Sequence, residues 1–205
     1  MKKEIKVCII NLGINNLHSI YNACLKAGYS TRILEEKEKL KGDIAILPGI
    51  GSFSSGMLSI KKKKIKEKIT EYLSKPNSFL YGICLGMQLF FKKSFEFKKT
   101  DGLGLIDGEV KKINSRIVPH MGWNTLKFKK KKLHIKKFIN TYFYFVHSYI
   151  CHPKNHDNIF ASTCYDKSNF CSIVKKKNIF GTQFHPEKSG LSGIKFLKSL
   201  KKFLD

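Results

Sequence analysis

The segment around Cys84 constrains the fold more than any other part of the chain. Residues 78–81 are apolar and short enough to form a buried strand, and residues 87–91 predict the start of a helix. Gly82 and Gly86 flank the cysteine, and without side chains they permit a strained turn and a close helix–strand approach. We therefore expect Cys84 to be exposed at a helix N-terminus, where the helix dipole favours a thiolate. This context favours a nucleophile over the alternative, a buried structural cysteine.

A thiolate nucleophile needs a base, and His185 is the best candidate among the seven histidines. It follows the apolar run 178–182, so it is predicted to lie at the end of a strand. Glu187 stands two residues further on, at a spacing that lets its carboxylate fix the orientation and tautomer of the imidazole. Pro186 stiffens the connection between them. Cys84 and His185 are far apart in sequence, so the fold has to bring them together.

Strand-like and helix-like segments alternate along the chain. This order predicts an α/β fold with a central, mostly parallel sheet flanked by helices and with a smaller β-rich segment. We expect helices at residues 16–27, 57–73 and 192–204, and strands at 5–10, 30–34, 44–47, before Cys84 and before His185. The β-rich segment spans residues 102–173, with strands near 108–113, 124–128, 142–149 and 159–163. With no repeat or linker in its 205 residues, the chain is expected to form one domain.

Composition narrows the classes of protein that the chain can belong to. No run of eighteen apolar residues predicts a membrane span, and the first six residues do not resemble a secretory signal. The six cysteines are scattered without a C-x-x-C pair, which argues against a zinc site and favours reduced thiols in the cytoplasm. No metal and no cofactor are expected.

The formal net charge of +24 is unusual and would ordinarily suggest a nucleic-acid partner. The excess is almost all lysine, since only Arg32 and Arg116 are arginines, and surfaces that clamp phosphates favour arginine. The lysines are also spread along the chain, with runs at 61–64 and 129–132. A nucleic-acid role is therefore not expected, although a basic nucleic-acid-binding module stays open as the non-enzyme alternative.

Three segments together resemble the class I, or triad-type, glutamine amidotransferases: residues 82–88 around Cys84, residues 185–187, and the Pro-Gly-Ile-Gly turn at 48–51. The resemblance implies that the triad Cys84, His185 and Glu187 hydrolyses glutamine. It also implies that backbone N–H groups near Gly49, Gly51 and Leu85 hold the oxyanion. The residues implied in glutamine binding are Gln88, Glu96, His147 and Ser148. The alternative for Glu96 is a solvated acid at a helix end.

Residues 119–124, 144–149 and 183–189 resemble one branch of this family, which serves histidine biosynthesis. The similarity covers essentially the whole chain, so residues 1–205 are expected to be one type-1 glutamine amidotransferase domain. The resemblance implies a heterodimer with a (β/α)8-barrel cyclase, which receives ammonia and forms imidazole glycerol phosphate and an aminoimidazole carboxamide ribotide. The residues implied at or near that interface are Asn16, His120, Trp123, Asn124 and Tyr144. For Trp123 and Tyr144 the alternative is a role as core aromatics.

The loop after the first strand departs from the pattern of this branch. The family shows D-Y-G-x-G-N, whereas residues 11–16 read Asn-Leu-Gly-Ile-Asn-Asn, with Asn15 in place of a glycine. Asparagine is the residue next best able to adopt a positive φ. Two enzyme alternatives stay open: a paralogous amidotransferase that supplies ammonia to another synthase, such as one for bacterial surface sugars, and a cysteine hydrolase of another α/β family.

Overall fold

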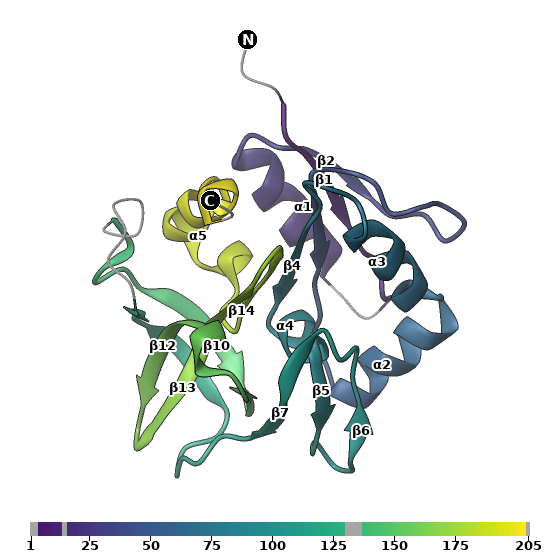
Figure 1. Cartoon of the computed structure of the whole chain (residues 1–205). Coiled ribbons are helices and arrows are strands. Elements are labelled where there is room, and N and C mark those ends of the chain that lie inside the picture. The colour runs from purple at the N-terminus through teal and green to yellow at the C-terminus, as the bar shows by residue number, and fades with distance from the viewer. Residues whose placement is uncertain (1–3, 14–15, 130–136, 204–205) are drawn as a thin grey trace.

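The computed structural model describes residues 4–13, 16–129 and 137–203 (Figure 1). The elements of the first half are β1 (Lys6–Ile9), α1 (Leu17–Lys26), β2 (Ser30–Ile33), β3 (Ile44–Leu47), α2 (Phe53–Lys62), α3 (Ile65–Leu73), β4 (Phe79–Ile83), α4 (Leu85–Leu89), β5 (Phe91–Ser94), β6 (Thr100–Asp101) and β7 (Ile106–Lys112). Those of the second half are β8 (His120–Asn124), β9 (Lys127–Phe128), β10 (Phe143–His147), β11 (Tyr149–Pro153), η2 (His156–Asn158), β12 (Ile159–Tyr165), β13 (Ser168–Lys176), β14 (Ile179–Thr182), η3 (Pro186–Lys188), α5 (Gly190–Leu197) and η4 (Leu200–Phe203).

Twelve of the described strands form one sheet, in which the order β2-β1-β3-β4-β14-β13-β11-β7-β5-β6 forms the main path. The strands from β2 to β14 are parallel, and β13, β11 and β7 continue the sheet antiparallel. Strands β3, β4 and β14 are buried at every position, as expected of parallel strands that are covered on both faces. The predicted α/β fold with a mostly parallel central sheet and a smaller β-rich segment is confirmed.

The two faces of the sheet have separate cores. On one face α1 and α5 pack over Phe79, Tyr81 and Phe180, and on the other α2, α3 and α4 pack over Leu80 and its neighbours. Figure 1 shows α5 and α1 on one side of β4 and the pair α2 and α3 on the other. Because alternate residues of a strand point to opposite faces, the apolar strands supply both cores at once.

A second, two-stranded sheet pairs β8 with β10 in antiparallel register, and we call it the β8–β10 ribbon. Its residues alternate between buried and more exposed positions: His120 faces the core opposite His147, while Trp123 pairs with Tyr144 on the outer face. The inner face packs with Phe143 and Phe145 into the core that also contains α5. The ribbon is therefore anchored on one side and open on the other.

Several element boundaries differ from those expected from the sequence. The helix expected at 57–73 is two helices, because Lys64 adopts a left-handed conformation with φ +52° between α2 and α3. The helix after Cys84 has five residues and gives way at once to β5. The strand expected at 124–128 is divided between β8 and β9, and β13 was not predicted. The last helix ends at Leu197, where η4 follows a short break.

Candidate active site

Three neighbouring parallel strands place the predicted catalytic residues at one edge of the sheet. Strands β3, β4 and β14 lie side by side, with Leu47 opposite Gly82 and Ile83 opposite Thr182. The Gly49–Gly51 turn follows β3, Cys84 follows β4, and His185 follows β14. In a parallel sheet the carboxyl ends of the strands share one edge, which is where open α/β sheets bind their ligands.

Cys84 occupies a strained corner, as predicted. Its φ of +51° is rare for a residue other than glycine, and its N–H donates to Thr182 O at 2.7 Å. A Cβ on Gly86 would lie 1.8 Å from Leu47 O, and one on Gly82 would lie 2.6 Å from the Phe90 ring. The two flanking glycines therefore allow the close approach that the sequence indicated.

The exposure predicted for Cys84 is wrong. Only 7% of the residue is exposed, because the ribbon covers it and Val146 O lies 3.8 Å from Sγ. Helix α4 has only five residues, so its dipole is small. Stabilisation of a thiolate at this position has to come mainly from neighbouring side chains.

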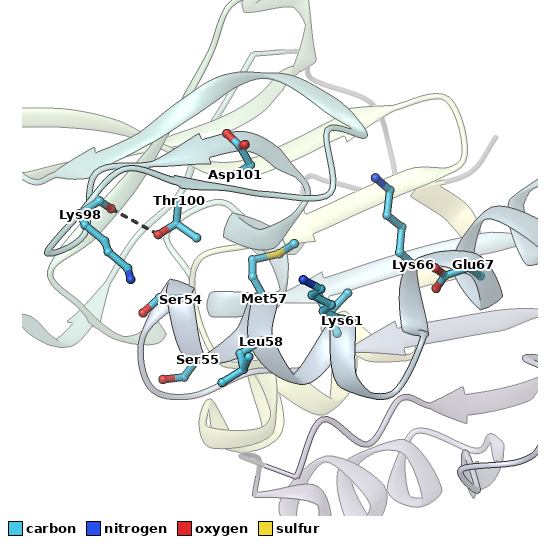
Figure 2. Close-up of a pocket in the computed structure, with 11 residues that line it drawn as sticks. Ser54, Ser55, Met57, Leu58, Lys61, Lys66, Glu67, Lys98, Thr100 and Asp101 are labelled. Atoms are coloured by element: carbon cyan, nitrogen blue, oxygen red, sulfur yellow. Dashed lines mark hydrogen bonds between the residues drawn. The ribbon is translucent and has the colours of Figure 1, made fainter.

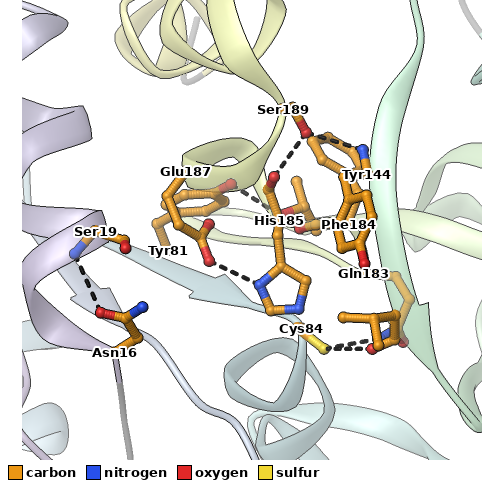
Figure 3. A network of polar contacts seen from close by, with 12 residues as sticks. Asn16, Ser19, Tyr81, Cys84, Tyr144, Gln183, Phe184, His185, Glu187 and Ser189 are labelled. Carbon is orange, nitrogen blue, oxygen red and sulfur yellow. Dashed lines mark hydrogen bonds and ion pairs between the residues drawn. The ribbon is translucent and has the colours of Figure 1, made fainter. Parts of the chain in front are cut away.

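His185 and Glu187 form a buried pair (Figure 3). The Nδ1 atom of His185 lies 2.7 Å from Glu187 Oε1, and the two side chains are 2% and 5% exposed. Figure 3 shows the imidazole between the Glu187 carboxylate and the Cys84 sulfur. Burial alone would lower the pKa of His185, but the adjacent Cys84 and Glu187 outweigh it and raise that pKa. The arrangement therefore favours the protonated imidazole beside the Cys84 sulfur.

The main chain of His185 is fixed by the ribbon. Its N–H donates to Tyr144 O at 2.9 Å, and its carbonyl accepts from Ser189 Oγ at 2.7 Å. Ser189 Oγ in turn accepts from Tyr144 N at 2.9 Å. These three bonds tie His185 to β10. No feature of the sequence pointed to Ser189.

A cavity of about 660 Å³ opens beside Cys84. Eight of the predicted site residues line it: Gly51, Cys84, Leu85, Gln88, Glu96, His147, Ser148 and His185. Glu187 lies behind His185, and Gly49 lines a smaller hollow with His185 and Asn16. A Cβ on Gly49 would lie 2.9 Å from Leu85 Cβ, so the turn after β3 packs directly on the first residue of α4. The structure thus brings the residues predicted for catalysis and for glutamine binding together.

Glu96 is not a helix-end acid, because it follows strand β5. One of its carboxylate oxygens accepts a hydrogen bond from Phe53 N, at the start of α2, and its own N–H donates to Ser94 Oγ. Partial burial raises the pKa of Glu96, which the bond from Phe53 N opposes. A carboxylate held in this way on the cavity wall can accept a cationic group.

The histidines of the ribbon form a chain of hydrogen bonds. His147 Nδ1 lies 3.0 Å from Tyr149 O, and His147 Nε2 lies 3.0 Å from His120 Nδ1. Asn124 Nδ2 reaches His120 Nε2 at 3.4 Å and also donates to Cys164 O. Burial lowers the pKa of His120 to about 4 and, together with the His120 charge, that of His147 to about 3. Both rings are therefore neutral at pH 7.

The residues predicted for a partner interface have different environments. Trp123 is 55% exposed, so it is not a core aromatic, and its ring meets that of Tyr144 edge to face at 5.9 Å. His120 is only 2% exposed and lies beneath this surface. Asn16 caps α1 by accepting from Ser19 N.

The atypical loop after β1 is partly described. Asn11 Oδ1 accepts from Gly13 N at 2.8 Å, and Asn11 O accepts from Lys63 Nζ at 3.1 Å. The positive φ expected at Asn15, like residues 130–132 of the second lysine run, lies outside the described residues.

A second hollow, of about 580 Å³, lies over α2, α3 and β6 and is lined by Met57, Leu58 and three lysines among others (Figure 2). None of the predicted site residues lines it. Within residues 4–13, 16–129 and 137–203, no group of three or more His, Cys, Asp or Glu side chains could hold a metal ion. Among the helices of those residues, none is long and apolar enough to cross a membrane.

The fold and the buried cluster of Cys84, His185 and Glu187 are those expected of a glutamine amidotransferase. The family described as "Glutamine amidotransferase class-I" matches residues 8–199, and this chain belongs to it. Two relatives are both named imidazole glycerol phosphate synthase subunit HisH. The one from Pyrococcus furiosus is 42% identical, and the similarity covers 96% of this chain and 98% of that relative. The one from Caldanaerobacter subterraneus is 40% identical, and the similarity covers 93% of this chain and 95% of that relative. The solved structure of PurLQS from Thermotoga maritima has a similar fold, with a TM-score of 0.76 and 19% sequence identity. The match covers 99% of this chain and 100% of that chain.

Proposed function

We propose that this chain is the glutaminase subunit of an imidazole glycerol phosphate synthase in histidine biosynthesis. It would hydrolyse glutamine to glutamate and pass the ammonia to a (β/α)8-barrel cyclase. The observation that carries the proposal is the buried contact of His185 Nδ1 with Glu187 Oε1, next to Cys84 on the wall of the cavity. The two relatives named as HisH, similar over nearly their full length, support the choice of pathway.

The first half of the reaction forms a thioester. The Cys84 thiolate attacks the carboxamide carbon of glutamine, and a C–S bond forms while the carbonyl oxygen becomes an oxyanion. Backbone N–H groups near Gly51 and Leu85 would hold that oxyanion, which is worth about 3 to 4 kcal/mol for a well-placed donor. The protonated His185 gives its Nε2 proton to the leaving nitrogen, the C–N bond breaks, and ammonia departs.

The second half returns the enzyme to its starting state. Neutral His185 takes a proton from water, and the resulting hydroxide attacks the thioester carbon. The C–S bond breaks, glutamate leaves, and the thiolate again faces an imidazolium. Throughout, Glu187 holds the Nδ1 proton so that Nε2 is the atom that faces Cys84.

The cavity wall offers partners for both ends of the amino-acid group of glutamine. The Glu96 carboxylate would pair with the ammonium, with Gln88 beside it, and the main chain at His147 and Ser148 would complete the pocket. The six cysteines are all free, which supports a reducing compartment such as the cytoplasm.

The cyclase would dock on the outer face of the β8–β10 ribbon. Met121 and Trp123 are 61% and 55% exposed there, and large exposed apolar side chains are typical of interfaces. The same ribbon holds the main chain of His185 through Tyr144. Docking on it could therefore affect the base directly.

The test is to measure glutamate release from glutamine by the purified chain, alone and with the cyclase and its ribotide ligand, beside Cys84→Ala. Strong stimulation by the cyclase that is lost in Cys84→Ala is the expected result. Glutaminase activity without a response to the cyclase would contradict the pathway and point to another synthase. Failure to complement a histidine auxotroph would do the same. No activity in either setting would contradict the mechanism.

A further inference from the structure

Gln183 is a fully buried polar side chain that the mechanism above does not use. It lies between β14 and His185, with 0% of the residue exposed, and its main-chain N–H donates to Ser172 O at 2.9 Å. Its side chain turns toward the nucleophile, and Nε2 lies 3.6 Å from Cys84 Sγ (Figure 3). The polar atoms of a buried amide need hydrogen-bond partners, so those partners show which end of the Gln183 amide faces Cys84.

The orientation of the Gln183 amide follows from the carbonyl of Tyr149. A main-chain carbonyl can only accept, so the group of Gln88 that lies 3.0 Å from Tyr149 O is its NH₂ group. The same Gln88 Nε2 lies 3.2 Å from the Gln183 side chain, and it meets an acceptor there, Oε1. The NH₂ group of Gln183 is thereby left facing Cys84 Sγ. The hydrogen-bond partners thus fix the orientation of both amides.

Besides His185, the sulfur has two polar neighbours, and these two favour different protonation states. Val146 O, at 3.8 Å, can only accept, so it interacts favourably with the thiol S–H. The Gln183 NH₂ group can donate to a thiolate, and hydrogen bonds to a charged acceptor are the stronger kind. Because Cys84 is 7% exposed, this side-chain donor acts in a largely buried environment, where a hydrogen bond to a charge is stronger than in water.

We propose that Gln183 is a further catalytic residue, whose side-chain N–H donates to the Cys84 thiolate and stabilises it. It would act before the attack on glutamine and again when the thiolate leaves the thioester. Gln88 serves as its positioning residue. Both hydrogens of Gln88 Nε2 are taken by Tyr149 O and Gln183 Oε1, so Gln88 Oε1 is the atom left to accept from the substrate ammonium. The proposal depends on the proposed function only in taking Cys84 as the nucleophile.

The test measures the rate at which iodoacetamide alkylates Cys84 as a function of pH, followed by mass spectrometry of the Cys84 peptide. Gln183→Met and Gln183→Leu replace the amide by an apolar side chain of similar size and so remove the donor. We expect their profiles to move to higher pH, with alkylation at pH 7 slower by about tenfold, the effect of one hydrogen bond to a charged group. Ser172→Ala is the matched control, because this side chain is equally buried and its hydroxyl makes no hydrogen bond. Its profile should coincide with that of the wild type.

Folded Gln183 variants with the wild-type profile would overturn the proposal, because a purely structural role would change thermal stability alone. A measurement on the wild-type chain covers the case in which neither variant folds. The Gln183 side-chain amide resonances should shift with pH in step with alkylation and should not shift in Cys84→Ala. Resonances that do not titrate would overturn the proposal as well.

Alkylation needs no glutamine, so this result is separable from the proposed function. A chain that is alkylated as expected but releases no glutamate would contradict the proposed reaction and still support the role of Gln183. In an active chain, Gln183→Met should lower kcat about tenfold and leave KM within about twofold, since the donor acts on the nucleophile. A rise in KM at constant kcat would contradict that role.

Discussion

His120 Nδ1 lies 3.0 Å from His147 Nε2, directly across the β8–β10 ribbon, and both rings are nearly excluded from solvent. The carbonyls at the two ends of this chain fix every proton in it. Tyr149 O requires the proton of His147 on Nδ1, and Cys164 O requires the NH₂ group of Asn124 to face His120 Nε2. The remaining proton is therefore on His120 Nδ1. His147, which lines the cavity, is therefore held by a series of hydrogen bonds between neutral groups that all donate in the same direction, from Asn124 toward Tyr149 O.

Replacing His120 by phenylalanine should destabilise the chain. Phenylalanine can occupy the space between Phe145 and Tyr165, where the imidazole stacks, but it cannot donate to His147 Nε2. Leaving this buried acceptor unsatisfied should lower the free energy of unfolding by about 1–3 kcal/mol. Urea denaturation measures the change. Met121→Ala, on the exposed face of the same strand, should stay within about 0.5 kcal/mol of the wild type. If His120→Phe were as stable as the wild type, the hydrogen bond from His120 Nδ1 to His147 Nε2 would be contradicted.

The same histidines predict how stability depends on pH. The pKa values of His120 and His147 are lowered to about 4 and about 3, below the value of about 6.5 for an unfolded histidine. As pH falls from about 6.5 toward 4, the unfolded chain binds protons that the folded chain does not, so stability falls. Above about 6.5 this contribution is complete. Urea unfolding at pH 7, 6 and 5 should show that the free energy of unfolding depends less steeply on pH in His120→Phe than in the wild type. Met121→Ala, which removes an exposed side chain without a titratable group, should keep the wild-type slope.

Glu187→Gln should remove most of the glutaminase activity and leave the chain folded. The amide keeps the size of the carboxylate but no longer holds the His185 proton on Nδ1, so Nε2 is not reliably available to Cys84. Comparable loss of an orienting carboxylate in a triad lowers kcat by about 10⁴-fold, and we expect at least ~10²-fold here. Glutamate release measures it, with the exposed Glu67→Gln on α3 as an unaffected control. Full activity in Glu187→Gln would show that the carboxylate does not orient the base.

Gly86→Ala should prevent stable folding or lower the free energy of unfolding by more than about 3 kcal/mol. Its Cβ would lie 1.8 Å from Leu47 O, a backbone atom of a fully buried strand that cannot move aside. Thermal unfolding and soluble yield measure the effect. Gly28→Ala is the control, since a Cβ there meets nothing within 4 Å and only the φ of +85° is unfavourable, which costs about 1 kcal/mol. A Gly86→Ala chain as stable as Gly28→Ala would disprove the close approach.

Trp123→Ala should weaken binding to the cyclase. A large exposed aromatic residue at the centre of an interface is often worth about 2 kcal/mol or more, which corresponds to a Kd about 30-fold weaker. Isothermal titration calorimetry with the purified cyclase measures it. Leu191→Ala removes an even more exposed apolar side chain from α5, outside the ribbon, and should leave the Kd unchanged. If both substitutions had the same effect, the docking face would lie elsewhere.

The proximity of Cys84, His185 and Glu187 could be predicted because each stands in a short motif that also specifies its local structure. Gly82 and Gly86 indicated the corner at Cys84, and Glu187 stands within the same turn as His185. Lys64 carries no comparable signal, because a lysine in a run of lysines gives no sign of a positive φ. The role suggested for Gln183 could not be predicted either. It depends on Gln88 and Tyr149, which are distant in sequence and meet only in the folded chain.

The alternation of the β8–β10 ribbon has a consequence for how such chains can diverge. Met121 and Trp123 point outward while His120 contacts His147, so the outer side chains can change without disturbing the cavity wall. The lengths of β8 and β10 cannot change as freely. Losing one residue from either strand would exchange the two faces, turning the histidines toward solvent and the tryptophan toward the core. Relatives that serve different partners should therefore differ in the composition of these strands and agree in their length.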